Sequence, residues 1–307
     1  AVHSVVYAGF SVGSLRGRIQ DAQAKVVITA DVGYRRGNEV DLKGICDETV
    51  ADMDLVEHVV VWNRKGPPES RGPKDIDFDQ LLADSSIDCQ AEEMDSEDPL
   101  YILYTSGTTG TPKGVQHVHG GYMVGTYYHF KTFWDVKDDD VFWCTSDIGW
   151  VVGHSYIVYA PLFKGCTTVL FEGKPVGTPD AGAFWKIISE YKVKSLFTAP
   201  TAFRAIKKED PEGKFFSKYD LSSFESLFLA GERADPDTIK WAETLLKVPV
   251  IDHWWQTETS WAISSNCTGI EMQKTKYGSA CRAVPGYDVK VLKSDSSIAK
   301  PNEMGDI

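Results

Sequence analysis

The most informative stretch of the chain reads Tyr104-Thr105-Ser106-Gly107-Thr108-Thr109-Gly110-Thr111-Pro112-Lys113-Gly114, directly after the apolar run Pro99-Leu100-Tyr101-Ile102-Leu103. Glycines allow backbone N–H groups to turn toward an anion, hydroxyls add hydrogen-bond donors, and a lysine supplies positive charge. We therefore expect this loop to bind ATP or a related nucleotide. The alternative is a flexible glycine- and threonine-rich turn between two elements.

The spacing within the loop excludes the commonest phosphate-binding motif. A Walker loop requires Gly-x-x-x-x-Gly-Lys-Ser/Thr. Here Pro112 precedes Lys113 and Gly114 follows it, so no hydroxyl stands after the lysine to hold magnesium. A hydrolase with a nucleophile elbow is excluded in the same way, because Gly153-His154-Ser155-Tyr156-Ile157 lacks the second glycine of Gly-x-Ser-x-Gly.

Composition narrows the class of protein. The formal net charge of the 307-residue chain is -12, which argues against nucleic acid as a partner because phosphate backbones require basic surfaces. No apolar run is long enough to span a membrane, and no signal peptide is visible. Six cysteines without a Cys-x-x-Cys pair indicate reduced thiols. We expect a soluble intracellular protein of the cytoplasm or mitochondrial matrix, with small-molecule partners.

Short β-branched runs alternate with helical patterns, which predicts an α/β fold with parallel sheets covered by helices. The predicted strands are residues 25–29, 58–62, 100–104, 167–171, 194–198, 226–230 and 248–252. The predicted helices are residues 14–24, 120–133, 181–191, 201–208 and 236–247. At the start of the last helix, Asp235 offers an N-cap and Pro236 an N1 residue.

Two segments depart from this alternation. Residues 64–98 are acidic and polar with little periodicity, so we expect a long surface excursion. Residues 286–292 alternate as a separate, smaller β segment would. Both ends of the chain look cut, since the sequence opens in a strand and turn and stops where a strand begins.

The loop resembles the signature of the adenylate-forming enzymes, which include acyl-CoA synthetases, luciferases and peptide-synthetase adenylation domains. Further segments resemble the short-chain acyl-CoA synthetase branch, close to propionyl-CoA and acetyl-CoA synthetases. They are Phe142–Tyr156, Ala199–Phe203, Gly231–Arg233, Asp252–Thr259 and Gly278–Tyr287. In order, they cover most of the chain.

The resemblance implies a fold as well. Residues 1–307 would form an AMP-binding (adenylation) domain, truncated at both ends. It would consist of two α/β subdomains, with residues 278–307 starting a small β part. A mobile C-terminal domain, which carries the catalytic lysine in this family, would lie beyond residue 307.

The implied first step joins a carboxylate and ATP to give an acyl-adenylate and pyrophosphate. In that step Lys113, Thr257 and Glu258 would serve the chemistry, with Glu258 linked to Mg2+. The nucleotide would be bound by the loop, by a triplet after a predicted strand, and by a second wall. These residues are Thr105, Ser106, Gly107, Thr108, Thr109, Gly110, Gly231, Glu232, Arg233, Asp252, His253, Trp254, Trp255, Gln256 and Thr257.

The acyl pocket implied by the resemblance is lined by Trp150, Val151, Val152, Ala230 and Trp255. The volume of Trp255 would block long acids. Acetate-preferring relatives usually have valine in place of Ala230 and threonine in place of Val152, so this chain has a wider, more apolar wall. That difference favours propionate, with acetate second; ordinary core variation at these positions is the alternative.

The implied second step transfers the acyl group to coenzyme A. Arg35 matches a position that contacts its phosphates in relatives, while the second arginine of the pattern falls on Asn38, and neighbouring Arg36 could compensate. The expected substrates are thus a short-chain carboxylate, ATP with Mg2+, and coenzyme A. The rival hypotheses are an acetate-preferring acetyl-CoA synthetase and a catalytically incomplete fragment that only binds nucleotide.

Overall fold

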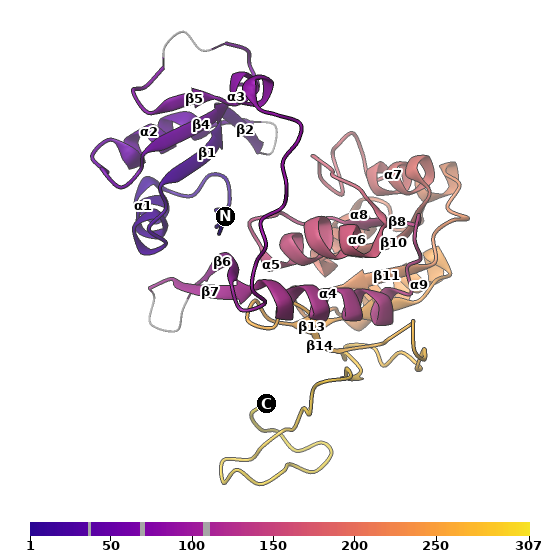
Figure 1. Ribbon diagram of the computed structural model, residues 1–307. Coiled ribbons are helices and arrows are strands. Elements are labelled where there is room, and N and C mark those ends of the chain that lie inside the picture. Colours follow the sequence, from indigo (N-terminus) through magenta and orange to yellow (C-terminus); the bar gives the residue numbers. More distant parts are fainter. Residues whose placement is uncertain (36–37, 68–70, 107–110) are drawn as a thin grey trace. The chain divides into compact units, whose positions relative to one another are not determined.

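The computed structural model describes residues 1–35, 38–67, 71–106 and 111–307. The chain folds into two compact units, Ala1–Gly120 and Gly121–Ile307. Both units combine helices with parallel strands, as the alternation in the sequence predicts (Figure 1).

The first unit contains a three-stranded parallel sheet in the order β1-β4-β5, and two antiparallel hairpins, β2–β3 and β6–β7. Its strands are β1 (Val26–Ala30), β2 (Val32–Arg35), β3 (Asn38–Asp41), β4 (His58–Trp62), β5 (Asp75–Asp77), β6 (Pro99–Thr105) and β7 (Lys113–Val118). Its helices are α1 (Val12–Asp21), α2 (Leu42–Val50) and α3 (Phe78–Asp84). The core lies between the sheet and the first two helices, where Ile19, Cys46 and Val59 pack together.

The second unit is built on a five-stranded parallel sheet in the order β12-β11-β10-β8-β9. The strands are β8 (Val141–Cys144), β9 (Thr167–Thr168), β10 (Val193–Thr198), β11 (Ser226–Leu229) and β12 (Val250–Asp252). The helical elements are α4 (His119–Trp134), α5 (Val151–Gly153), the π-helix η1 (His154–Tyr159), α6 (Ala160–Lys164), α7 (Ala183–Tyr191), α8 (Pro200–Glu209), η2 (Phe216–Lys218) and α9 (Pro236–Leu246). A small antiparallel sheet follows, with β13 (Trp254–Trp255), β14 (Ala262–Ser265) and β15 (Arg282–Ala283).

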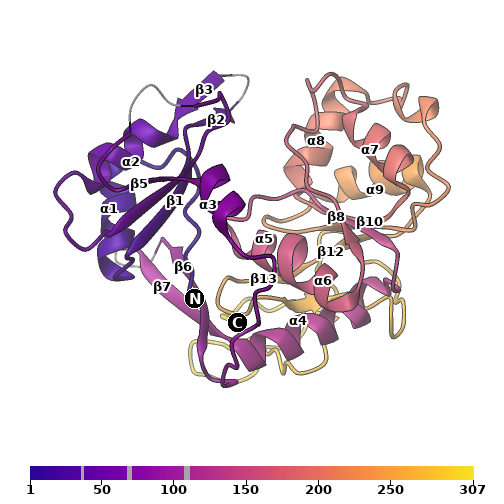
Figure 2. The ribbon, with the colours of Figure 1, turned by 45° about the horizontal axis from the view of Figure 1, so that its top comes forward.

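Both faces of the five-stranded sheet are buried because its strands are apolar on both sides. Along β11, Phe228 packs into a cluster with α4 and η1, whereas Leu227 and Leu229 pack into a second cluster with α7, α8 and α9. Figure 2 shows these three helices on one side of the sheet and α4 on the other. Strands buried on both faces read as nearly continuous apolar runs, and the sequence predicts β10, β11 and β12 in this way but misses β8.

Most predicted elements are confirmed within a few residues of their predicted bounds. The N-cap is also confirmed, since the Asp235 carboxylate accepts a hydrogen bond from the backbone N–H of Thr238 at 2.9 Å. The strand predicted at 167–171 is wrong beyond Thr168, because β9 is a two-residue edge strand paired only with β8.

Residues 64–98 and 278–307 differ in part from expectation. The first segment contains β5 and α3, and it is exposed from residue 79 to residue 97. In the second, the described backbone forms β15 and isolated bridges of Leu292 to Ile298 and to Asp306, but no strand over residues 286–292. Of its alternating apolar residues, Tyr287 packs against the core cluster that contains Phe130, whereas Val291 is exposed.

Gly153 allows the chain to turn back on itself before η1. A Cβ at this position would lie 2.3 Å from the backbone oxygen of Asp147 and 2.5 Å from the Cα of Ile148. We expect Gly153→Ala to lower the free energy of unfolding by about 1–3 kcal/mol, because backbone must shift to admit the methyl group. Urea denaturation measures this change. Gly17→Ala in α1 is the control, since nothing lies within 4 Å of its Cβ position; it is expected to be neutral or stabilising.

Candidate functional site

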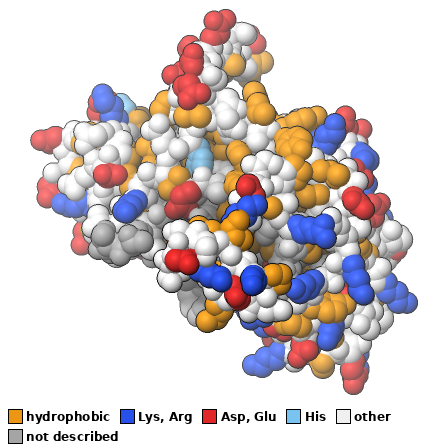
Figure 3. Space-filling view, turned by 90° about the horizontal axis from the view of Figure 1, so that it is seen from below, with side chains coloured by type: hydrophobic (Ala, Val, Ile, Leu, Met, Phe, Trp, Pro, Cys, Tyr) orange, Lys and Arg blue, Asp and Glu red, His pale blue; other side chains and the backbone are white. Residues whose placement is uncertain are grey.

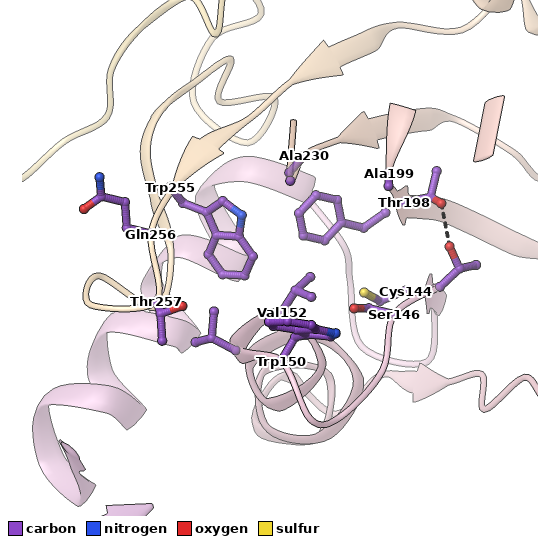
Figure 4. Close-up of a pocket in the computed structure, with 14 residues that line it drawn as sticks. Cys144, Ser146, Trp150, Val152, Thr198, Ala199, Ala230, Trp255, Gln256 and Thr257 are labelled. Atoms are coloured by element: carbon purple, nitrogen blue, oxygen red, sulfur yellow. Dashed lines mark hydrogen bonds between the residues drawn. The ribbon is translucent and has the colours of Figure 1, made fainter. Parts of the chain in front are cut away.

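A cavity of about 490 Å³ opens in the second unit at the carboxyl ends of its parallel strands (Figure 4). Its lining comes from the ends of β8, β10 and β11, from the start of α5, and from the segment after β12. The lining residues are Cys144, Thr145, Ser146, Trp150, Val151, Val152, Phe197, Thr198, Ala199, Ala230, Gly231, Trp255, Gln256 and Thr257. This volume lies within the usual range for small-molecule sites.

Strand order explains why the cavity forms there. From β8 the chain continues to β9 on one side, whereas from β10 it continues to β11 on the other. Connections that leave neighbouring strands in opposite directions open a crevice at the carboxyl ends, which is where α/β proteins bind ligands. The hydroxyl of Thr145 donates to that of Thr198 across this crevice at 2.5 Å.

All five residues of the predicted acyl pocket line the cavity. In Figure 4, Ala230 and the indole of Trp255 lie on one side of it, with Val152 and Trp150 on the other. Val151 and Ala230 are buried, while Trp150 is half exposed. The structure therefore gathers side chains that are far apart in sequence around one mainly apolar cavity.

Aromatic neighbours support the ring of Trp255. Its centroid lies 5.5 Å from that of Tyr156 and 6.1 Å from that of Phe197. Offset and tilted ring pairs at such distances are favourable, and they fix the ring's position. Trp255 is thus a rigid boundary of the cavity.

The predicted nucleotide residues of this unit divide into two groups. Gly231, Trp255, Gln256 and Thr257 line the cavity, and Gly231 has a φ of 97°, which glycine adopts without strain. The others do not line it: Glu232, Arg233, Asp252, His253 and Trp254.

Each of the outlying residues has a structural setting of its own. The Glu232 carboxylate accepts a hydrogen bond from Arg204 at 2.5 Å. Asp252 is buried, and burial raises the pKa of its carboxyl group, while backbone N–H groups of His253 and Ala234 and the charge of Arg233 act in the opposite direction.

His253 is enclosed by aromatic rings rather than exposed to the cavity. Its Nδ1 lies 3.0 Å from the Ser265 hydroxyl, and burial lowers the pKa of the imidazole to about 3. The pKa of His129 is lowered to about 4 by the same cause. Both histidines are therefore neutral, structural side chains at physiological pH.

These two histidines predict acid sensitivity. In an unfolded chain each would titrate near 6.5, so below that pH the unfolded state binds protons that the folded state does not. We expect the free energy of unfolding to fall by about 1.4 kcal/mol per pH unit for each histidine as the pH drops from about 6.5 toward 4. Urea denaturation at about pH 7.5 and about pH 5 measures this loss. His253→Phe should reduce the slope; an unchanged slope would contradict the assignment.

Glu258 lies in the turn that follows β13. The turn is closed by hydrogen bonds from the backbone N–H groups of Thr259 and Ser260 to the Gln256 carbonyl, both at 3.2 Å, and Glu258 itself is exposed. Among the described residues, no group of three or more His, Cys, Asp or Glu side chains gathers to hold a metal ion. A single carboxylate is typical of a site for Mg2+ that arrives bound to nucleotide phosphates. A site built from protein ligands alone would need several such groups.

In the first unit, the hairpin β6–β7 carries the loop predicted to bind phosphates. Thr105, the last residue of β6, pairs with Lys113, the first residue of β7. The pairing places the first hydroxyl-bearing residue of the loop beside the lysine. Ser106 and Lys113 are exposed. The predicted residues Gly107–Gly110 lie outside the described part of the chain. A Cβ at Gly114 would meet the Cγ2 of Ile102 at 2.9 Å, which explains the glycine.

The predicted coenzyme A residues lie on the hairpin β2–β3. Arg35 and Asn38 are partners across it, and Asn38 is exposed. Arg36 lies outside the described residues, as does the side chain of Arg35. The backbone therefore brings two of the three predicted positions together.

Sequence reasoning missed six lining residues at the ends of β8 and β10: Cys144, Thr145, Ser146, Phe197, Thr198 and Ala199. Residues 144–146 lie at the carboxyl end of β8, and residues 197–199 lie at the carboxyl end of β10. Their position at the end of a strand was the signal that the sequence offered. Only the strand order shows that these two ends are neighbours.

Figure 3 shows one face, on which acidic, basic and hydrophobic side chains are interspersed without a continuous basic stripe. None of the helices in the described ranges is both long and apolar enough to cross a lipid bilayer.

Comparisons with known proteins give the family. The family model described as AMP-binding enzyme matches residues 1–307. An uncharacterized protein of Pseudomonas aeruginosa is 47% identical over 100% of this chain and 49% of its own length. The human mitochondrial acyl-CoA synthetase short-chain family member 3 is 44% identical over 100% of this chain and 45% of its own length.

An acetyl-coenzyme A synthetase of Laribacter hongkongensis is 44% identical over 99% of this chain and 47% of its own length. The crystal structure of an acyl-CoA synthetase from Brucella canis superposes with a TM-score of 0.82 at 28% identity, covering 99% of this chain and 51% of that one. The chain spans about half the length of the curated relatives it matches. Since the family model matches from the first residue to the last, the chain belongs to the AMP-binding enzyme family.

Proposed function

We propose that the protein activates a short-chain carboxylate with MgATP and then transfers the acyl group to coenzyme A. The observation that carries this proposal is that Val151, Val152, Ala230 and Trp255 line one cavity beside Gly231. Relatives named as short-chain acyl-CoA and acetyl-coenzyme A synthetases support the same reaction class.

In the first step, a carboxylate oxygen attacks the α-phosphorus of ATP. The bond between the α-phosphorus and the bridging oxygen to the β-phosphate breaks, and pyrophosphate leaves. Both reactants are anions, so the protein must offset their charge and hold them in line. We assign the β- and γ-phosphates to the β6–β7 hairpin with Lys113, the α-phosphate to Thr257, and the magnesium carried by ATP to Glu258.

No general base is required in this step, because a short carboxylic acid is already ionised at neutral pH. His154, in η1, is buried, and its Nδ1 lies 3.3 Å from the Trp150 carbonyl oxygen. We assign it a structural role in holding Trp150 at the edge of the cavity.

In the second step, the thiolate of coenzyme A attacks the acyl carbon, the bond from that carbon to the phosphate oxygen breaks, and AMP leaves. We assign contacts with coenzyme A phosphates to the β2–β3 hairpin, where Arg35 and Arg36 supply positive charge and Asn38 a polar group. Charge-assisted contacts of this kind suit phosphate.

We further propose that propionate is preferred over acetate. Ala230 leaves space that a valine would fill, and Val152 presents only methyl groups to the acid. One additional buried methylene is worth about 0.8 kcal/mol. Sites of this kind separate acids that differ by one methylene by about 10- to 200-fold at most, so acetate is expected to be a slower substrate.

Carboxylate-dependent ATP–pyrophosphate exchange tests the reaction and the preference together, with acetate, propionate and butyrate offered to the full-length protein. Equal rates with acetate and propionate would contradict the preference, and no exchange with any acid would contradict the function. The same assay on residues 1–307 distinguishes a catalytically complete domain from one that only binds nucleotide.

Ala230→Val is expected to reverse the preference. The two added methyl groups would occupy the space proposed for the terminal methyl of propionate, so the ratio of kcat/KM for propionate to that for acetate should fall by about 10-fold. Steady-state kinetics with both acids measure the ratio. Ala262→Val is the control, because Ala262 is buried in the same cluster but does not line the cavity; its ratio should not change.

A further inference from the structure

An aromatic side chain at the end of β6 links the β6–β7 hairpin to α1. Tyr104 precedes Thr105 and lies opposite Gly114 in the hairpin. A Cβ at Gly114 would meet Tyr104 Cε1 at 3.3 Å, so the ring lies over the backbone of the partner strand. Its hydroxyl reaches across to α1, 83 residues earlier, and donates to Asp21 at 2.6 Å.

A cation completes the arrangement. The Arg18 guanidinium lies 5.5 Å from the centroid of the Tyr104 ring and 4.8 Å from that of Phe10. Arg18 is itself held by hydrogen bonds to the carbonyl and hydroxyl oxygens of Ser14, at 2.7 and 2.6 Å. The ring of Tyr104 is thus held both at its face, by the Arg18 guanidinium, and through its hydroxyl, because a cation near an aromatic face is favourable.

Helix stability alone would not favour an aspartate at position 21. Asp21 is the last residue of α1, where the partial negative charge of the helix end disfavours a carboxylate. Local rules of this kind are usually broken where a residue serves another purpose. Burial, and then the Asp21 carboxylate, raise the pKa of Tyr104, so the phenol keeps its proton and acts as the donor.

We propose that Tyr104 and Asp21, with Arg18, are positioning residues that hold Thr105 and Lys113 in place for the β- and γ-phosphates of ATP. The inference rests on the nucleotide role proposed above for this hairpin. We call the hydrogen bond from Tyr104 to Asp21 the tether. Its loss should slow the half-reaction that releases pyrophosphate, and it should not slow thioester formation from a supplied acyl-adenylate.

Tyr104→Phe in the full-length protein removes the tethering hydroxyl and keeps the ring. We expect kcat/KM for ATP in pyrophosphate exchange to fall by about 3- to 10-fold, as for loss of one partly exposed hydrogen bond to a charged group. The rate of coenzyme A acylation from added acyl-adenylate should stay at the wild-type value. Asp21→Asn, which retains an acceptor oxygen, should show a smaller effect.

Amide hydrogen exchange provides a readout that does not depend on activity. Protection at Thr105 and Lys113 should decrease in Tyr104→Phe, and unchanged protection would overturn the tether. The positioning role would be overturned if Tyr104→Phe loses this protection but slows pyrophosphate exchange and coenzyme A acylation equally. It would also be overturned if the variant loses the protection and slows neither reaction. If the wild-type protein shows no pyrophosphate exchange, the proposed function fails. Amide hydrogen exchange still decides in that case whether the tether exists.

Tyr277→Phe is the matched control. The Tyr277 hydroxyl donates to Glu243 at 2.6 Å, a bond of the same kind and length, in the second unit. Its loss should leave pyrophosphate exchange and the protection of Thr105 and Lys113 unchanged. An equal effect in this variant would show that loss of any such bond lowers activity, and would overturn the specific role of Tyr104.

Discussion

Replacing Trp255 with glycine is expected to change the preferred acid from the three carbons proposed above to about six. The ring closes one side of the cavity and is held by Tyr156 and Phe197, so its removal opens space that neighbouring side chains cannot readily fill. Three more buried methylenes at about 0.8 kcal/mol each correspond to roughly a 60-fold gain for hexanoate relative to propionate. Propionate itself should lose at least about 10-fold in kcat/KM, because the cavity no longer fits it.

The measurement is kcat/KM across a series of straight-chain acids, from acetate to octanoate. Trp254→Gly is the control: it changes the neighbouring residue of the same strand, which does not line the cavity, and it should leave the chain-length preference unchanged. A folded Trp255→Gly protein with the wild-type preference would show that the acid binds elsewhere.

Replacing Glu258 with glutamine is expected to lower the rate of pyrophosphate exchange by about 10²- to 10³-fold. Glutamine keeps the shape of the side chain and removes its charge, and Glu258 is exposed, so the turn between Gln256 and Ser260 should remain folded. The magnesium carried by ATP would lose a hard oxygen ligand and its alignment with the attacking acid.

Pyrophosphate exchange at increasing Mg2+ concentration measures the effect, and high Mg2+ should restore part of the rate. Acylation of coenzyme A from added acyl-adenylate should be much less affected, because that step needs no ATP-bound magnesium. Glu271→Gln, another exposed glutamate of the second unit, should behave as wild type. An unchanged rate and Mg2+ dependence in Glu258→Gln would exclude the metal role.

Sequence alone predicted β10, β11 and β12 because they are apolar on both faces, as Phe228 with Leu227 and Leu229 illustrates, but it did not predict β8. It also named the five acyl-pocket residues, through the resemblance of their segments to a known family. It could not predict that Thr145 and Thr198 meet, since that depends on β8 and β10 being neighbours. Strand order arises from long-range packing, which no local pattern records.

The short elements of the first unit were missed for a different reason. β5 and α3 together span only residues 75–84, and their residues are mainly polar or partly exposed, so hydrophobic periodicity gives little signal. β7 begins with Lys113-Gly114, which is a poor strand start by propensity, and it is stabilised by pairing with β6. In both cases the tertiary partner, and not the local sequence, determines the structure.

The core cluster that contains Phe130, Phe228 and Ala230 also has Val152 and Trp255 packed against it. The lining proposed to select the acid is therefore the outer surface of the same packed interior that supports the sheet. A substitution that enlarges the acid-binding space also removes contacts from that interior, at a cost of about 2–5 kcal/mol for a large side chain. Substrate range and folding stability cannot evolve independently in this protein: a lineage that accepts bulkier acids should carry compensating changes on α4 or η1.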